Sequence, residues 1–250
     1  MKIYYSENAE QLGKKAAELT AAHLNAAIKE KGRARLILST GASQFTTLSN
    51  LVTLDVDWSK VEMFHLDEYI GIDESHPASF VKYLKERFVS KVNLKAVHFV
   101  DVSNGAENII KKLTAELNEE TVDVGLIGIG ENGHIAFNDP PADFDTEEAY
   151  KIVNLDEKCR NQQLGEGWFP TIDDVPKQAI SMTVKQILKC RHIVSAVPYA
   201  VKAQAIHDTL TNDITNVVPA TAFKMHDDVS LCIDKDSASM IDISKYDVIK

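Results

Sequence analysis

The chain has 250 residues, of which 44% are hydrophobic and 26% are charged, and its formal net charge is −10. This composition is typical of a globular protein with one sizeable core, so we expect a single α/β domain over residues 1–250. The acidic balance and the lack of a dense Lys/Arg run argue against nucleic acid as a partner, because binding a phosphate backbone needs a basic face.

Targeting and cysteine signals are weak. No apolar run reaches the length of a membrane span, and Met1 leads directly into a short strand, so we expect a cytoplasmic protein without a membrane partner. The three cysteines, Cys159, Cys190 and Cys232, are scattered and have no C-x-x-C spacing. They predict neither a disulfide framework nor a metal site.

Apolar strand patterns alternate with helical patterns along the whole chain. We expect strands at about 2–5, 34–39, 61–66, 97–100, 122–127, 151–155, 192–197 and 228–233. We expect helices at about 8–31, 44–52, 79–88, 106–117, 156–163 and 199–209. Regular alternation predicts a doubly wound, mostly parallel sheet with helices on both faces, which is a Rossmann-like architecture.

The segment after the second strand contains Thr40, Gly41, Ala42 and Ser43 and leads into a helix. Hydroxyl groups and free backbone N–H groups meet there, so the segment is a candidate phosphate cradle. It lacks the Gly-Lys-Ser/Thr of a Walker A loop, which argues against a nucleoside triphosphate.

Two acids, Asp67 and Glu68, follow the third strand, where an ordinary solvated turn is the alternative interpretation. Further along, Gly165, Gly167 and Trp168 lie in an irregular segment that ends at Pro170. Two glycines followed by aromatic residues predict a lid that can cover a pocket, and a static surface loop is equally compatible.

The loop from Gly128 to Pro140 follows a buried strand and concentrates polar groups. Asn132, His134 and Asp139 supply an amide, an imidazole and a carboxylate, which together can move a proton between oxygens near neutral pH. The glycine spacing does not match the dinucleotide fingerprint, because the prolines that follow cannot begin a long helix. From the spacing of these residues alone, a catalytic loop and an ordinary turn are equally good interpretations of the segment.

These motifs resemble the glucosamine-6-phosphate deaminase/isomerase family, which includes galactosamine-6-phosphate isomerases and is related to the 6-phosphogluconolactonases. The resemblance rests on Asp67-Glu68-Tyr69, on Ser79, Phe80 and Tyr83, and on Gly-Ile-Gly-Glu-Asn-Gly-His-Ile-Ala-Phe-Asn-Asp-Pro at 128–140. The phosphogluconolactonases typically show Asp-Glu-Arg and Gly-His-Thr-Ala-Ser-Leu-Phe at these two places, which favours the deaminase side.

The resemblance implies a hexosamine-6-phosphate deaminase that forms a ketose 6-phosphate and ammonia without a cofactor. His134, oriented by Asp139 and Asn132, would open the sugar ring. Asp67, with Glu68 beside it, would move the C2 proton. Lys202 and the segment 40–43 would hold the phosphate.

Several departures from the family pattern leave alternatives open. Many members have Asp in place of Asn132 and Glu in place of Asp139. The phosphate-binding arginine of the family aligns with Gln163, so we expect Arg160, one helical turn earlier, to take its place. The sequence does not decide between the gluco and the galacto epimer at C4 of the substrate. A phosphogluconolactonase-like hydrolase and a non-catalytic sugar-phosphate sensor are alternative functions, and a homo-oligomer is possible. Some relatives have an allosteric site for an amino-sugar phosphate that depends on basic residues after the His134 loop. Residues 143–148 of this chain are acidic instead, so we expect no such site.

Overall fold

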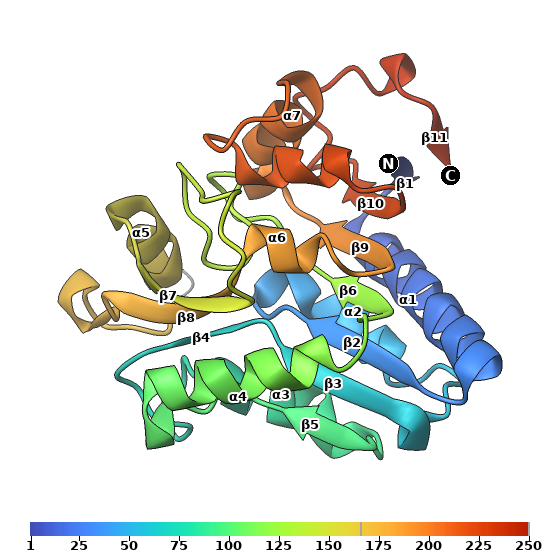
Figure 1. The fold of residues 1–250 in the computed structure, drawn as a ribbon. Coiled ribbons are helices and arrows are strands. Elements are labelled where there is room, and N and C mark those ends of the chain that lie inside the picture. Colours follow the sequence, from blue (N-terminus) through green and yellow to red (C-terminus); the bar gives the residue numbers. More distant parts are fainter. Residues whose placement is uncertain (166, 250) are drawn as a thin grey trace.

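A computed structural model describes residues 1–165 and 167–249 (Figure 1). Within these residues, eight strands form one main sheet in which every pair of neighbours is parallel. Their order is β11 (Val248–Ile249), β1 (Lys2–Ser6), β10 (Val229–Asp234), β9 (His192–Val197), β6 (Val124–Leu126), β2 (Ala34–Leu38), β3 (Val61–His65) and β5 (Ala96–His98). The expectation of a doubly wound, mostly parallel sheet is confirmed.

The central strands are apolar on both faces because helices cover both faces. All five residues of β2 are buried. Leu36 and Leu38 point into one hydrophobic cluster, whereas Ile37 between them points into the other. This alternation explains why the strand is continuously apolar in the sequence: each side chain finds a core, and none faces water.

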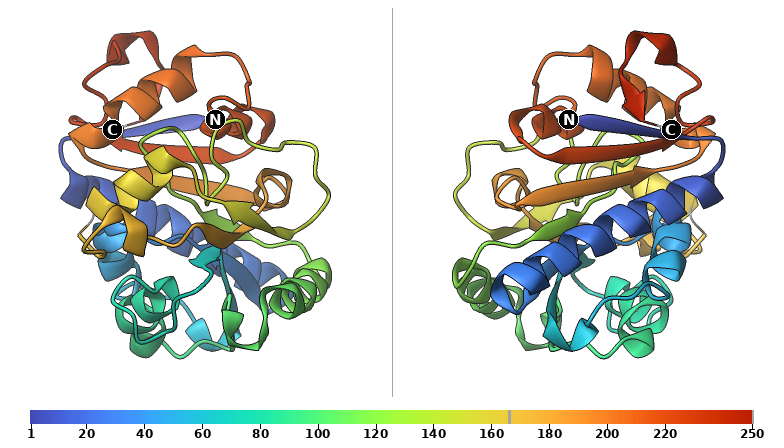
Figure 2. Two further views of the ribbon diagram at one scale, coloured as in Figure 1. Left: turned by 90° about the vertical axis from the view of Figure 1, so that its left-hand side faces the viewer. Right: turned by 90° about the vertical axis from the view of Figure 1, so that its right-hand side faces the viewer.

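Three helices cover one face of the sheet and three cover the other (Figure 2). The first group is α1 (Ala9–Lys31), α2 (Phe45–Leu51) and α3 (Phe80–Arg87); the second is α4 (Ala106–Asn118), α6 (Val184–Ile187) and α7 (Ala203–Thr211). The longest helix, α1, begins where the Asn8 side chain accepts a hydrogen bond from Gln11 N and ends at Gly32, whose φ is 77°. Both ends are common helix-capping arrangements, so the sequence specifies the helix boundaries locally.

A second, antiparallel sheet lies beside the main one and was not expected. It consists of β4 (Asp67–Tyr69), β8 (Gln178–Met182) and β7 (Tyr150–Asn154), in that order. The strand expected at 151–155 is therefore β7 of this sheet, and β8 was missed altogether. Helix α5 (Glu157–Gly165) follows β7. Because β4 directly follows β3, the small sheet holds Asp67 at the carboxyl end of the main sheet.

One helix boundary was wrong in a way that affects the site. The helix expected at 199–209 is divided into the 3-10 turn η6 (Ala200–Lys202) and α7, so Lys202 lies before the α-helix. Tyr199, which precedes the turn, has a φ of 80°. Among the described helices, none combines the length and the apolarity needed to cross a membrane.

Candidate active site

The carboxyl ends of β2, β3, β6 and β9 surround one cavity of about 170 Å³. Segments that directly follow these four strands supply most of its wall: residues 39–43, 66–67, 128–131 and 199–202. In open parallel sheets this edge is the usual place for a ligand, since loops from neighbouring strands converge there. The cavity brings together the loops that the sequence analysis had treated separately.

The His134 side chain reaches the cavity because two glycines shape its loop. A Cβ atom at Gly130 would lie 2.2 Å from Nε2 of His134, so only glycine permits the ring to pack against the backbone there. Gly133 has a φ of 82°, a left-handed conformation that other residues rarely adopt. The imidazole is buried, with 8% of the residue exposed, and it lines the cavity wall.

Asp139 and Asn132 hold the imidazole from behind. Nδ1 of His134 lies 3.1 Å from Oδ1 of Asp139, at ion-pair distance but without the alignment of a hydrogen bond. The Asn132 amide donates to the same carboxylate oxygen at 3.2 Å, and its own oxygen accepts from His134 N at 3.1 Å. Neither residue lines the cavity, so both position His134 and do not face a ligand.

The charge of Asp139 is favoured in this arrangement. Burial raises the pKa of its carboxyl group, but the neighbouring His134 imidazole and the Asn132 amide outweigh burial and leave that pKa below its ordinary value. An ionised Asp139 fixes the orientation of the ring and stabilises an imidazolium when His134 takes up a proton.

Asp67 lies on the cavity wall with His134. Its environment raises its pKa, whereas the environment of Asp139 lowers the pKa of that residue. Asp67 is only 6% exposed, and burial together with the adjacent Glu68 carboxylate raises the pKa of Asp67 to about 8. A carboxyl group with a pKa near the working pH can both accept and return a proton. Such a shift in a cleft is also a common mark of a functional site.

Glu68 points away from the cavity, as expected for the next residue of a strand. Its carboxylate accepts hydrogen bonds from Ser79 Oγ at 3.0 Å and from Val81 N at 2.8 Å, at the start of α3. Burial raises the pKa of Glu68 despite these hydrogen bonds. Glu68 therefore joins β4 to α3 and places a second carboxyl group behind Asp67.

The candidate phosphate cradle and Lys202 line the same cavity. Gly41 has a φ of 98°, and its carbonyl accepts a hydrogen bond from the Tyr83 hydroxyl at 2.9 Å, which fixes the loop. The buried Ser39 hydroxyl has no hydrogen-bond partner in the described part of the chain. An unsatisfied hydroxyl on a cavity wall indicates a polar ligand.

The chain is similar to known proteins over nearly its whole length. A family model described as "Glucosamine-6-phosphate isomerases/6-phosphogluconolactonase" matches residues 7–231. The chain belongs to this family. A glucosamine-6-phosphate deaminase of Thermoanaerobacter sp. (strain X514) is 34% identical over 100% of both chains, and one of Streptococcus pneumoniae (strain Hungary19A-6) is 32% identical over 97% of this chain and 100% of its own.

Solved structures show the same relationship at the level of the fold. A monomeric glucosamine-6-phosphate deaminase superposes with a TM-score of 0.88 at 30% identity, covering 96% of this chain and 100% of that one. A 6-phosphogluconolactonase of Trypanosoma brucei has a TM-score of 0.80 at 14% identity, covering 96% and 98%. At 14% identity the second comparison shows the fold alone.

Arg160, expected among the phosphate ligands of this family member, does not line the cavity. Its guanidinium donates to the backbone carbonyls of Ile172 and Val175, so it braces the chain after α5. Gln163 lines the cavity instead, and its Oε1 accepts a hydrogen bond from the Tyr69 hydroxyl at 2.5 Å. One helical turn separates the two residues, and helix α5 turns Arg160 away from the site.

The lid prediction falls on a segment that contains Glu166, which lies outside the described residues. Of its neighbours, Gly167 has a φ of 83°. Trp168 is 39% exposed and lines an adjacent cavity of about 280 Å³, which shares Gly41, Ala42 and Phe80 with the site cavity. Trp168 thus lies next to the site, and its closure over a ligand remains a prediction.

The sequence analysis did not identify several residues of the cavity wall. Tyr199 is the clearest case: its left-handed φ is held by a hydrogen bond from Tyr199 N to the buried Asp234, 35 residues away. No local signal in the sequence predicts this conformation. Cys159 was also missed as a neighbour of the site, since its Sγ lies within 4.8 Å of ligand atoms of both His134 and Asp139. Burial and Asp139 raise the pKa of this thiol, which disfavours the thiolate that a metal needs.

Proposed function

We propose that the protein is a hexosamine-6-phosphate deaminase that converts an amino-sugar 6-phosphate and water to a ketose 6-phosphate and ammonia. The observation that carries the proposal is the presence of two different proton-transfer groups on one cavity wall: Asp67, with a pKa raised to about 8, and His134, backed by an ionised Asp139. Groups with such different environments suit two successive proton transfers.

The first transfer opens the sugar ring. His134 takes the proton of the anomeric hydroxyl and delivers it to the ring oxygen, which breaks the ring C1–O bond and leaves an aldehyde at C1. During the transfer the imidazolium is stabilised by Asp139, 3.1 Å from Nδ1. The Asn132 amide keeps Asp139 in place and adds no further charge.

The second transfer moves hydrogen between carbons. The aldehyde acidifies the C2 proton, which the Asp67 carboxylate accepts to give an enolamine. Returning a proton to C1 converts the enolamine to an imine, and water hydrolyses the imine to the ketose and ammonia. The raised pKa makes Asp67 a stronger base than an ordinary carboxylate, which is what a weakly acidic C–H bond requires.

The phosphate group fits donors on the wall of the same cavity. Lys202 supplies a buried cation, and the segment 40–43 supplies hydroxyl and backbone N–H donors. Gln163 can add a neutral amide donor where the family usually has an arginine. We therefore infer that the phosphate is bound by one buried side-chain cation and several neutral donors, in a molecule whose overall charge is −10.

Glucosamine 6-phosphate is the first substrate to test, because the relatives at 32–34% identity are named for it. Ammonia release would be measured with glucosamine 6-phosphate and with galactosamine 6-phosphate, and fructose 6-phosphate and tagatose 6-phosphate would be assayed as products. We expect turnover of glucosamine 6-phosphate. Faster turnover of galactosamine 6-phosphate would keep the reaction and change the epimer.

Two results would overturn the deaminase proposal. Binding of both sugars without turnover would indicate a sensor, and hydrolysis of 6-phosphogluconolactone without ammonia release from either amino sugar would indicate a lactonase. The His134→Gln variant provides an internal check, because it should fail with the cyclic sugar yet keep much of the solvent exchange at C2 of an open-chain analogue.

A further inference from the structure

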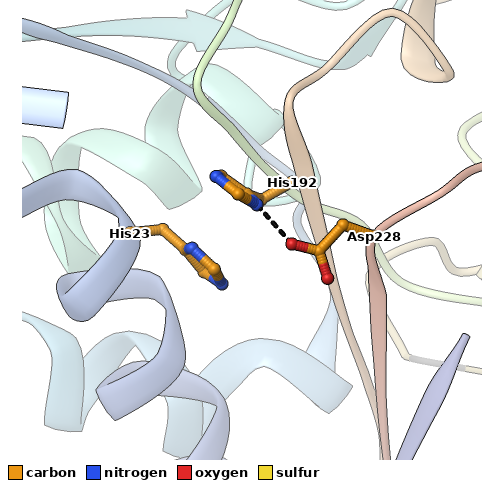
Figure 3. Close-up of side chains that lie close together, drawn as sticks. All are labelled: His23, His192 and Asp228. Carbon is orange, nitrogen blue, oxygen red and sulfur yellow. Dashed lines mark hydrogen bonds and ion pairs between the residues drawn. The ribbon is translucent and has the colours of Figure 1, made fainter. Parts of the chain in front are cut away.

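Three potential metal ligands meet at the amino-terminal edge of the main sheet, opposite the active site (Figure 3). His23 comes from α1, His192 is the first residue of β9, and Asp228 directly precedes β10. One ligand atom of each residue lies within 4.8 Å of the other two. All three residues are partly exposed, so solvent and ions can reach them.

The three side chains already contact one another. Nδ1 of His192 is 2.6 Å from Oδ2 of Asp228, and the rings of His23 and His192 stack with their centroids 3.8 Å apart. Lys2 Nζ lies 3.3 Å from the other carboxylate oxygen, Oδ1. One oxygen of Asp228 thus faces the histidines while the other is held by a cation.

The loop that carries Asp228 is fixed by a histidine that is not itself a ligand. Asp228 N donates to Nδ1 of His226 at 3.0 Å, and Nε2 of His226 is 2.7 Å from the carbonyl of Cys190. A ring that accepts at Nδ1 and donates at Nε2 is the neutral tautomer, with both nitrogens occupied. Asp228 is therefore positioned before any ion binds, as supporting contacts do in metal sites.

We propose that His23, His192 and Asp228 bind one divalent transition-metal ion, with Zn²⁺ as the best match. Two imidazoles and a carboxylate are ligands that Zn²⁺ prefers, and a water molecule completes a tetrahedron. Zinc–ligand bonds of about 2.0–2.2 Å put ligand atoms roughly 3.3–3.6 Å apart. The three ligand atoms already lie within 4.8 Å of one another, and the stacked rings of His23 and His192 must turn out of their parallel arrangement so that a nitrogen of each faces the ion. The ion takes the place of the hydrogen at Nδ1 of His192, and the ring binds it as a neutral imidazole whose hydrogen is on Nε2.

Such an ion would cross-link helix α1 to the starts of two neighbouring strands, far along the sheet from Asp67 and His134. Its role would be structural, and its binding can be measured independently of enzymatic turnover. This separation makes the proposal testable even if the proposed function fails.

Calorimetric titration of the EDTA-treated full chain with Zn²⁺ is the experiment. We expect one equivalent bound per chain, a Tm raised by about 5 °C at a hundredfold excess over Kd, and a Co²⁺ complex without a thiolate charge-transfer band. Affinity should fall at least tenfold in His23→Gln and in Asp228→Asn. The matched control is His207→Gln, because His207 also pairs with an aspartate, 2.9 Å away, but belongs to no three-ligand cluster in the described chain.

Three outcomes would overturn the site: no saturable binding of one equivalent, the same affinity in His23→Gln and Asp228→Asn as in the parent, or a Co²⁺ thiolate band. The last would place the ion at Cys159 beside His134. If one of the variants His23→Gln and Asp228→Asn folds poorly, the other still tests the site.

Discussion

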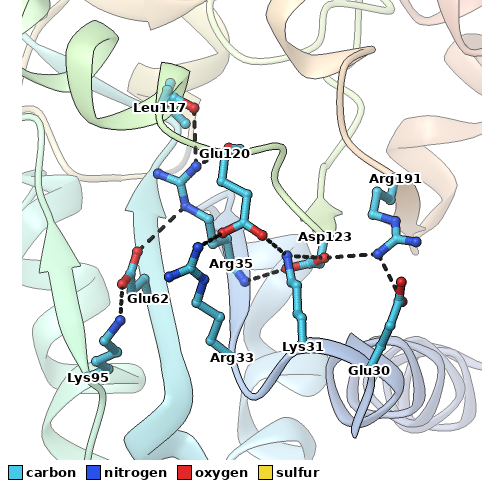
Figure 4. A network of polar contacts seen from close by, with 10 residues as sticks. All are labelled: Glu30, Lys31, Arg33, Arg35, Glu62, Lys95, Leu117, Glu120, Asp123 and Arg191. Carbon is cyan, nitrogen blue, oxygen red and sulfur yellow. Dashed lines mark hydrogen bonds and ion pairs between the residues drawn. The ribbon is translucent and has the colours of Figure 1, made fainter. Parts of the chain in front are cut away.

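Two groups of carboxyl side chains, one in a charged network at the amino-terminal end of the main sheet and the other the Asp67–Glu68 pair at its carboxyl-terminal end, have pKa values shifted in opposite directions. At the amino-terminal end, charged groups form a network in which each side chain has a partner of opposite sign or a backbone carbonyl (Figure 4). Arg35, only 2% exposed, donates to the carbonyls of Leu117, Glu116 and Glu120 at the end of α4, and its Nε lies 3.6 Å from Glu62.

Two carboxyl groups in this network, those of Glu62 and Glu120, have lowered pKa values and so ionise more easily than usual. Burial alone would raise the pKa of Glu62, but Lys95 and Arg35 outweigh burial and lower it. In the same way Lys31 and Arg33 lower the pKa of Glu120. A carboxylate with a lowered pKa stabilises the fold above its unfolded pKa, and that contribution is lost as the pH falls through the folded value. The network therefore stabilises the fold near neutral pH.

At the carboxyl-terminal end, Asp67 and Glu68 are buried next to each other and their pKa values are raised. A raised carboxyl pKa means that the ionised form costs stability in the folded state. The same sheet thus carries charged groups that stabilise the fold at one end, and carboxyl groups placed for proton transfer at the other. Proteins commonly give up stability at the active site in this way.

The sharpest test of the comparison is Asp67→Asn. Activity should fall by about 10²–10⁴-fold, because the amide cannot accept the C2 proton. Stability should rise instead. Between about pH 4 and pH 8 folded Asp67 keeps a proton that the unfolded chain has lost, so the stability of the parent falls with pH across this window and levels off above it.

Urea unfolding at pH 5 and pH 9 measures the effect. The Asn variant should gain on the parent by on the order of 5 kcal/mol at pH 9, and by on the order of 2 kcal/mol at pH 5. Asp143→Asn is the control, since this exposed carboxylate pairs with Lys151 and should change stability by about 0.5 kcal/mol or less. An Asp67→Asn variant that is less stable at both pH values would contradict the proposed cost of the buried charge.

The second test removes a charge at the opposite end. Arg35→Met should lower the free energy of unfolding by about 3–5 kcal/mol, because it leaves several buried helix-end carbonyls without their donor and removes one of the two cations beside Glu62. Arg33→Met is matched to it: this arginine lies two residues earlier, is 51% exposed and pairs with Glu120, so we expect a loss below about 1 kcal/mol. Similar losses in the two variants would show that burial of Arg35 is not what matters.

The third test concerns the cation of the site. Lys202→Gln should raise KM by about 5- to 100-fold, equivalent to about 1–3 kcal/mol of binding, and change kcat little. Arg160→Met should behave in the opposite way, lowering Tm without changing KM, because Arg160 contacts backbone carbonyls outside the cavity. A higher KM in Arg160→Met would restore Arg160 as a phosphate ligand and require helix α5 to move.

The smallest effect is expected for Glu68→Gln. Burial is the larger cause of the raised Asp67 pKa, and the Glu68 carboxylate is the second. Without that carboxylate, the acid limb of the kcat/KM profile should move from about pH 8 to lower pH by less than one unit. Burial, the larger cause, is unchanged, so the limb should stay well above pH 4. A limb that does not move, in a variant of unchanged Tm, would mean that Glu68 acts only by joining β4 to α3.

Local patterns in the sequence predicted most of the elements and the chemistry of the site. The apolar runs of β2 and β9, the Asn8 and Gly32 caps of α1, and the glycines around His134 are short-range signals, because each depends on backbone conformation or on burial of one segment. His134 and Asp139 share one short loop for the same reason, and the family resemblance implied that they pair.

What only the tertiary structure decided depends on contacts between distant segments. The central strand of the small sheet, β8, pairs with both β4 and β7, which are about 80 residues apart in sequence, and no local pattern could bring these strands together. The raised pKa of Asp67 needs burial, which several loops produce together, and the carboxyl group of Glu68 beside it. The direction of Arg160 follows from how α5 packs, and a shift of three residues on a helix brings Gln163 to the cavity in its place.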